Sequence, residues 1–193
     1  MTQPPTLLDR GPTLLAIARG AVAERLGLVA PPCAAARWLE EPGATFVTLH
    51  RQGQLRGCVG TLSPNRPLGE DVAANAREAA FRDTRFPPLA RSEYADTGFE
   101  VSLLSPLEPL RFESRAQLLG LLRPHEDGLV LSWDGHRGAF LPQVWEQLPD
   151  PADFLAHLNQ KAGLAPAAWN DEMRLSRFTV TRFQEGVGVG SPG

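Results

Sequence analysis

The sequence predicts an α+β fold, a mostly antiparallel or mixed sheet flanked by helices, and three observations lead to this class. Two pairs of strand-like segments, 45–50 with 54–59 and 128–133 with 136–141, are each joined by a short turn that contains glycine. Helical patterns do not alternate strictly with strands, which argues against a doubly wound parallel sheet. The length of 193 residues suits one domain whose core has room for two lobes.

Four segments have the periodicity of helices. Segments 13–28 and 68–82 each carry an apolar stripe at a spacing of three and four residues. Two shorter helices are predicted over 114–122 and 151–162, and Gly163 is a suitable residue to end the second one. These helices are expected to cover the sheet.

The remaining segments complete the predicted domain. Alternating apolar and polar residues predict a strand over 98–104 and one final strand over 174–183. Residues 1–10 are expected to form a flexible start, and the folded domain is expected to span 11–185. The glycine-rich residues 186–193 are expected to form a disordered tail.

Composition excludes several classes of function. The net charge is −3, without a domain-wide basic excess, so neither nucleic acid nor a membrane surface is an expected partner. No apolar run reaches the roughly 20 residues that span a bilayer, and no secretory signal opens the chain, which predicts a cytoplasmic protein. Cys33 and Cys58 belong to no Cys/His cluster at metal spacing, so no metal site is predicted, and the cofactor question stays open.

The segment Leu-Arg-Gly-Cys-Val-Gly, residues 55–60, is the candidate functional site. Strand alternation would put Arg56, Cys58 and Gly60 on one face, with the first two Cα atoms roughly 6.5–7 Å apart. A nearby guanidinium lowers the pKa of a thiol and favours the reactive thiolate, and Gly57 and Gly60 would leave space over the strand. Cys58 is therefore a candidate nucleophile, and an inert cysteine that packs as a small hydrophobe is an equal alternative.

His50 is tested as the base for Cys58 and is placed too far away. If the turn has three residues, 51–53, then His50 pairs with Gln54 and Phe46 pairs with Cys58. His50 would lie about 13 Å along the strand from Cys58, which is too far for a hydrogen bond. It is therefore interpreted as a solvated hairpin residue.

Four further polar residues are candidates. Asn75 lies on or beside the apolar face of its helix, where a structural amide is favoured over a ligand contact. Asp83 and Arg85 could form an ion pair at the end of that helix. Glu100 could share the cysteine's face and act as a general base if its strand joins the hairpin sheet, and a solvated strand face is the alternative.

The chain resembles the AMMECR1 family. Residues 46–62 look like the family signature, in which LRGC(I/V)G is the most specific part. Further blocks follow in the family's order, and together the matches cover roughly residues 10–184: 68–76, 80–89, 100–104, 138–144 and 161–163.

The resemblance implies a compact α+β fold with two unequal subdomains and a cleft lined by the signature. It also implies a bacterial or archaeal setting in which such proteins are member A of a three-part system, beside a Memo-like protein and a radical SAM protein. His50 and His136 lie outside the family's shared pattern. The family's recurring residues fall here on Arg56, Gly57, Cys58, Gly60, Asn75, Asp83, Arg85 and Glu100.

These observations leave three function hypotheses. In the first, the protein is an enzyme with Cys58 as nucleophile, Arg56 as its electrostatic partner and Glu100 as proton carrier. The other recurring residues would then bind substrate. In the second, the same cleft is a non-catalytic module that recognises a small anion, a peptide or a partner protein. Nucleic-acid binding through the scattered arginines is the weakest, because the chain is acidic and lacks a basic stripe.

Overall fold

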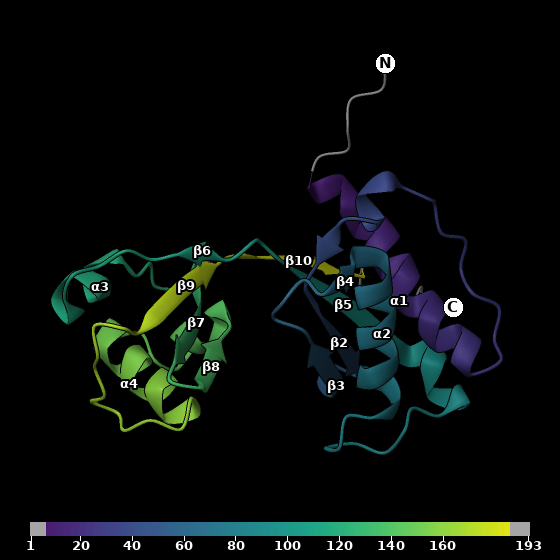
Figure 1. Ribbon diagram of the computed structural model, residues 1–193. Helices are drawn as coiled ribbons and strands as arrows, with labels where there is room; N and C mark the ends of the chain where they lie inside the picture. The colour runs from purple at the N-terminus through teal and green to yellow at the C-terminus, as the bar shows by residue number, and fades with distance from the viewer. Residues whose placement is uncertain (1–6, 186–193) are drawn as a thin grey trace. The chain divides into compact units, whose positions relative to one another are not determined.

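The computed structural model of the protein describes residues 7–185, which form two compact units (Figure 1). Unit 1 contains residues 7–103 and 181–185, and unit 2 contains residues 104–180. Each unit has a four-stranded sheet and its own hydrophobic cluster. The predicted α+β class, with two unequal subdomains, is confirmed.

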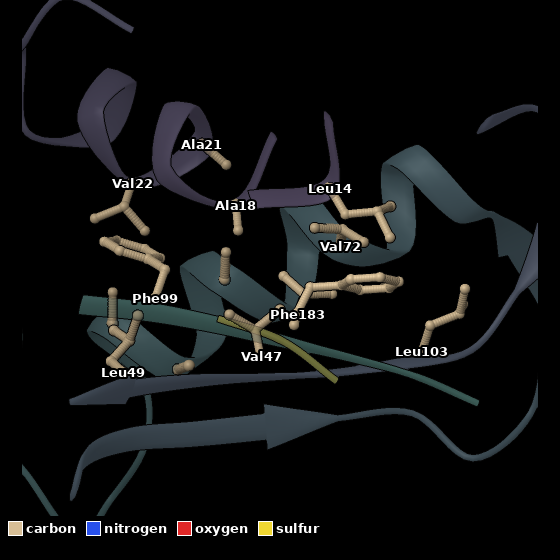
Figure 2. Packing of buried hydrophobic residues seen from close by; sticks show 14 of the residues in the cluster. Leu14, Ala18, Ala21, Val22, Val47, Leu49, Val72, Phe99, Leu103 and Phe183 are labelled. Carbon is tan, nitrogen blue, oxygen red and sulfur yellow. The ribbon is translucent and has the colours of Figure 1, made fainter. Parts of the chain in front are cut away.

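The sheet of unit 1 has the strand order β10-β5-β2-β3 and is covered on one face by two helices. Figure 2 shows Val22 of α1 next to Phe99 of the sheet, and Leu14 of α1 next to Val72. The elements are α1 (Gly11–Arg25), β2 (Thr45–Arg51), β3 (Gln54–Gly60), α2 (Leu68–Phe81), β5 (Thr97–Leu104) and β10 (Val180–Gln184).

Short elements connect these parts of unit 1. They are η1 (Leu8–Arg10), η2 (Arg37–Leu39), β1 (Pro42–Gly43) paired with β4 (Arg66–Pro67), and η3 (Arg91–Asp96). Part of the predicted flexible start is thus a 3-10 helix, and residues 1–6 and the predicted tail 186–193 lie outside the described residues. Helix α1 begins two residues earlier than predicted, since Pro12 fits the first turn, where a helix needs no donor.

Unit 2 is built around a sheet of order β6-β9-β7-β8. Ser114 and Asp150 cap its two α-helices through their side chains. In the core, the rings of Trp145 and Phe154 stack with centroids 3.8 Å apart. The elements are β6 (Glu108–Pro109), α3 (Arg115–Leu121), β7 (Gly128–Trp133), β8 (His136–Phe140), η4 (Pro142–Glu146), α4 (Pro151–Lys161) and β9 (Arg174–Phe178).

The predicted single strand 174–183 is wrong, because two strands in different sheets occupy it. The break falls at Thr179, whose N–H donates to Ser105 Oγ and whose carbonyl accepts from the Ser105 N–H. The buried residues Leu175, Phe178 and Phe183 are spaced by three and five, so they cannot share one face of a continuous strand. No helix within residues 7–185 has the length and apolar character needed to cross a membrane.

Candidate functional site

The β2–β3 hairpin that carries Cys58 has a different register from the predicted one. Its turn has two residues, Gln52 and Gly53, with φ of +52° and +75°, which is the conformation of a two-residue hairpin turn. A β-bulge then adds one residue on β3, because Leu49 pairs with Gly57 whereas His50 pairs with Leu55. The shorter turn and the bulge bring Thr48, and not Phe46, opposite Cys58.

Cys58 lies on the sheet face away from the helices. Val47 and Leu49 are buried in the core under α1 and α2, so Thr48 between them faces the other way. Thr48 pairs with Cys58 on β3 and with Glu100 on β5, which places these three residues in one row across three strands. The Thr48 hydroxyl donates to Cys58 Sγ at 3.4 Å, and the cysteine is half-buried.

The backbone of Cys58 is held from the edge of the sheet. Its N–H donates to Asp83 Oδ2 at 2.9 Å, and its carbonyl accepts from Arg85 Nη2 at 3.3 Å. Because β3 is an edge strand, these bonds occupy groups that would otherwise be open to another chain. Because the N–H and carbonyl of Cys58 point away from β2, Thr48 and Cys58 form a non-hydrogen-bonded pair, the type in which side chains approach most closely.

Asp83 and Arg85 form the predicted ion pair, with 2.6 Å between Nη2 and Oδ2. The hydrogen bond from Arg85 holds the pKa of Asp83 well below its usual range, and the backbone N–H of Cys58 adds to this shift against the opposing effect of burial. The Arg85 side chain is 55% exposed, whereas Asp83 is buried. The guanidinium next to Cys58 therefore keeps a face open to solvent.

Arg56 is the extra residue of the bulge, and it binds Glu93. Its Nε and Nη2 donate to the Glu93 carboxylate at 3.1 and 2.9 Å, and its buried Nη1 has no partner among the described residues. None of its nitrogens donates to the thiol, so the predicted Arg56–Cys58 partnership does not form as a hydrogen bond. The bulge explains the difference, because it interrupts the alternation from which a common face was predicted.

Glu93 is the carboxylate on which Arg56, Arg51 and the N–H of Ala90 converge. The hydrogen bonds from Arg56 lower the pKa of Glu93 to about 2, with a smaller contribution from Ala90. Sequence reasoning missed Glu93, since it lies in a 3-10 segment without apolar periodicity.

Glu100 does lie on the face of Cys58, as the sequence predicts for a strand that joins the hairpin sheet. It stands two strands from Cys58, roughly 10 Å between Cα atoms, with Thr48 between them. Within residues 7–185 its carboxylate has no ion-pair partner.

The two glycines of the site allow close packing and do not leave the strand uncovered. A Cβ on Gly57 would collide with the backbone carbonyl oxygen of Ala79 in α2, and one on Gly60 would collide with the ring of Phe46. Gly57 thus lets helix α2 approach the strand. The expected open space over both positions is not present.

Asn75 belongs to a buried network between α2 and β2, separate from the Cys58 row. Its amide donates to the Thr45 carbonyl and to Asp71, each at 2.9 Å. Asp71 is 1% exposed and also accepts from Thr61 and Arg66. These bonds join α2 to β2, which agrees with the structural interpretation of this amide.

Comparison with known proteins agrees with the family resemblance of residues 46–62. The family model named AMMECR1 matches residues 15–183. The chain belongs to the AMMECR1 family. It is 39% identical to a protein of Methanothermobacter thermautotrophicus over 96% of this chain and 99% of that one. It is 34% identical to a protein of Thermofilum pendens over 92% of this chain and 90% of that one.

A solved structure shares the AMMECR1 fold. The crystal structure of an uncharacterized protein from Pyrococcus horikoshii superposes with a TM-score of 0.79 at 32% identity, covering 92% of each chain. In this chain, residues 55–60 of the signature lie in an edge strand with a bulge at Arg56 and a half-buried thiol at Cys58. Among the described residues, no group of three or more His, Cys, Asp or Glu side chains is arranged to hold a metal ion.

Proposed function

We propose that this AMMECR1 protein is an enzyme that uses Cys58 Sγ as the nucleophile of a covalent group transfer. The observation that supports this most is that two hydrogen bonds fix the backbone of Cys58, one from its N–H to Asp83 and one from Arg85 to its carbonyl. The thiol itself lies on the sheet face. A reacting group must be positioned within a fraction of an ångström, and bonds on both sides of its backbone provide that.

Neighbouring side chains have distinct roles in this proposal. The Thr48 hydroxyl donates a hydrogen bond to Cys58 Sγ and thereby orients the sulfur. The exposed side of Arg85 binds an anionic part of the substrate, and Glu100 accepts or returns protons. Arg56, bound to Glu93, acts as a positioning residue for the bulge.

The remaining recurring residues hold Cys58 in place or support the fold around the site. Asp83 holds Cys58, Gly57 and Gly60 permit close packing, and Asn75 joins α2 to β2. The family resemblance supports a cytoplasmic setting in which the protein acts beside a Memo-like and a radical SAM protein.

A non-catalytic binding module is the second candidate, and the exposure of Arg85 favours it. A guanidinium whose inner side is bound by Asp83 and whose outer side is open is well oriented for a carboxylate or phosphate. In this alternative the Cys58 thiol is only packing.

The reaction of p-nitrophenyl acetate with two single-cysteine variants tests the enzyme proposal. In Cys33→Ser, Cys58 should take the acetyl group and release a burst of about one nitrophenolate per chain. In Cys58→Ser, where Cys33 remains, release should be slow and linear. Traces of equal shape from the two variants would contradict nucleophilic catalysis and leave the binding module.

A further inference from the structure

We propose that His50 is the base that accepts the proton of Cys58, so that Cys58, His50 and Glu100 act together as a Cys-His-Glu site. This inference rests on the proposed function and assigns the direct proton transfer to His50, with Glu100 acting on the proton through the His50 ring. It depends on the observed strand register, because His50 lies much closer to Cys58 in that register than in the one predicted from the sequence.

The register places the three side chains around Thr48. His50 lies two residues from Thr48 on β2, so both point to the face away from the helices. Because Thr48 pairs with both Cys58 and Glu100, His50 is the diagonal neighbour of each. Diagonal neighbours are about 7–8 Å apart, which long side chains can bridge, whereas the predicted register gave about 13 Å.

The surroundings of His50 leave its imidazole able to turn. Its partner on β5 is Gly98, and a Cβ there would meet only the His50 carbonyl oxygen, at 3.9 Å. The Nδ1 atom is buried and has no hydrogen-bond partner among the described residues. A buried ring nitrogen without a partner is unusual, and it marks hydrogen-bonding capacity that the resting structure does not use.

A carboxylate lies on the same sheet face as His50, beside it on β5. Glu100 has no ion-pair partner within residues 7–185, so its carboxylate is available to stabilise a positive ring. The two cations close in sequence, Arg51 on the same strand and Arg56 on β3, share the single carboxylate of Glu93, which offsets one of their two positive charges.

The chemical step is a proton transfer coupled to attack. The proton moves from Cys58 Sγ to a nitrogen of His50, the sulfur electron pair forms a bond to the electrophilic carbon, and the leaving group departs with its bonding electrons. Glu100 stabilises the imidazolium and the ring then returns its proton to the leaving group. No hydrogen bond joins the three side chains in the described part of the chain, and such bonds commonly tighten only with substrate bound.

Alkylation of Cys58 by iodoacetamide between pH 5 and 9 tests the role of His50. The parent protein is Cys33→Ser, so that only Cys58 reacts. Its rate should stay high toward neutral pH, and His50→Gln should lower the rate at pH 7 at least about tenfold and move the profile to that of an unassisted thiol. His50→Asn should behave in the same way, and Glu100→Gln should give a smaller change in the same direction.

Two controls separate this inference from the proposed function. His157→Gln on α4 of unit 2 replaces an exposed histidine, and its profile should match the parent. The first comparison is between Cys58 in the parent protein and Cys33 in the Cys58→Ser variant. If Cys58 reacts faster, but the His50→Gln and His50→Asn profiles equal the parent profile, the role of His50 is overturned and Cys58 remains the proposed nucleophile. If Cys58 reacts no faster than Cys33, the proposed function fails as well.

Discussion

Replacing Glu93 by alanine is expected to lower the free energy of unfolding by about 3–5 kcal/mol. The Arg56 side chain is 10% exposed, and its charge is compensated by the Glu93 carboxylate through two hydrogen bonds. Removing the carboxylate leaves a buried guanidinium without a counter-charge, which costs far more than the loss of a surface ion pair. Urea unfolding followed by circular dichroism measures the change.

Acid should reduce the stabilisation that the Arg56–Glu93 pair provides. Because Arg56 lowers the pKa of Glu93 to about 2, the stabilisation is fully present above pH about 4.3, the ordinary value, and is lost as pH falls toward 2. The difference between wild type and Glu93→Ala should therefore narrow over that window. Glu78→Ala is the matched control, since Glu78 pairs with Arg82 at the surface and should change stability by less than about 1 kcal/mol. Similar losses for both variants would contradict the role of Glu93 as the counter-charge of the buried Arg56.

The substitution Gly57→Ala is expected to destabilise the protein by about 3 kcal/mol, at the upper end for overpacking. The new methyl group would collide with the backbone carbonyl oxygen of Ala79, and backbone cannot turn aside as a side chain can. Either α2 or the edge strand must shift, so the rate at which Cys58 is alkylated should change too. Thermal unfolding and alkylation of the same sample measure both effects.

Gly69→Ala provides the comparison within the same unit. A Cβ on Gly69 would meet Leu39 at 3.5 Å, an ordinary contact, so stability should change by less than about 1 kcal/mol. If Gly57→Ala is as well tolerated as Gly69→Ala, the close approach of α2 to β3 is not as described.

Periodicity was sufficient to predict most elements of this fold. The helix predicted over 68–82 is α2, Leu68–Phe81, and the strand predicted over 98–104 is β5, Thr97–Leu104. Local turn chemistry predicted both hairpins. The final strand failed because alternation of polar and apolar residues cannot show that a chain changes sheets at Thr179.

The sequence predicted the segment that carries Cys58 and the Asp83–Arg85 ion pair, but not the register of the hairpin or the part played by Glu93. Gln-Gly as a two-residue turn and Arg-Gln-Gly as a three-residue turn are both compatible with the sequence, and a bulge leaves no periodic signal. The register decides which residue lies opposite Cys58. In the predicted register His50 is far from Cys58, whereas in the observed register it is a diagonal neighbour of Cys58. The binding of Arg56 by Glu93 joins positions 37 residues apart and requires the folded loop.

The most direct test of Cys58 as the reactive centre is a competition within the wild-type chain. The protein is exposed to less than one equivalent of iodoacetamide at pH 7, and the modified cysteine is identified by peptide mass mapping. Cys33 is the more exposed thiol, although desolvation raises the pKa of Cys33. The proposal predicts that the label is found on the Cys58 peptide in preference to that of Cys33. Label predominantly on Cys33 would contradict it.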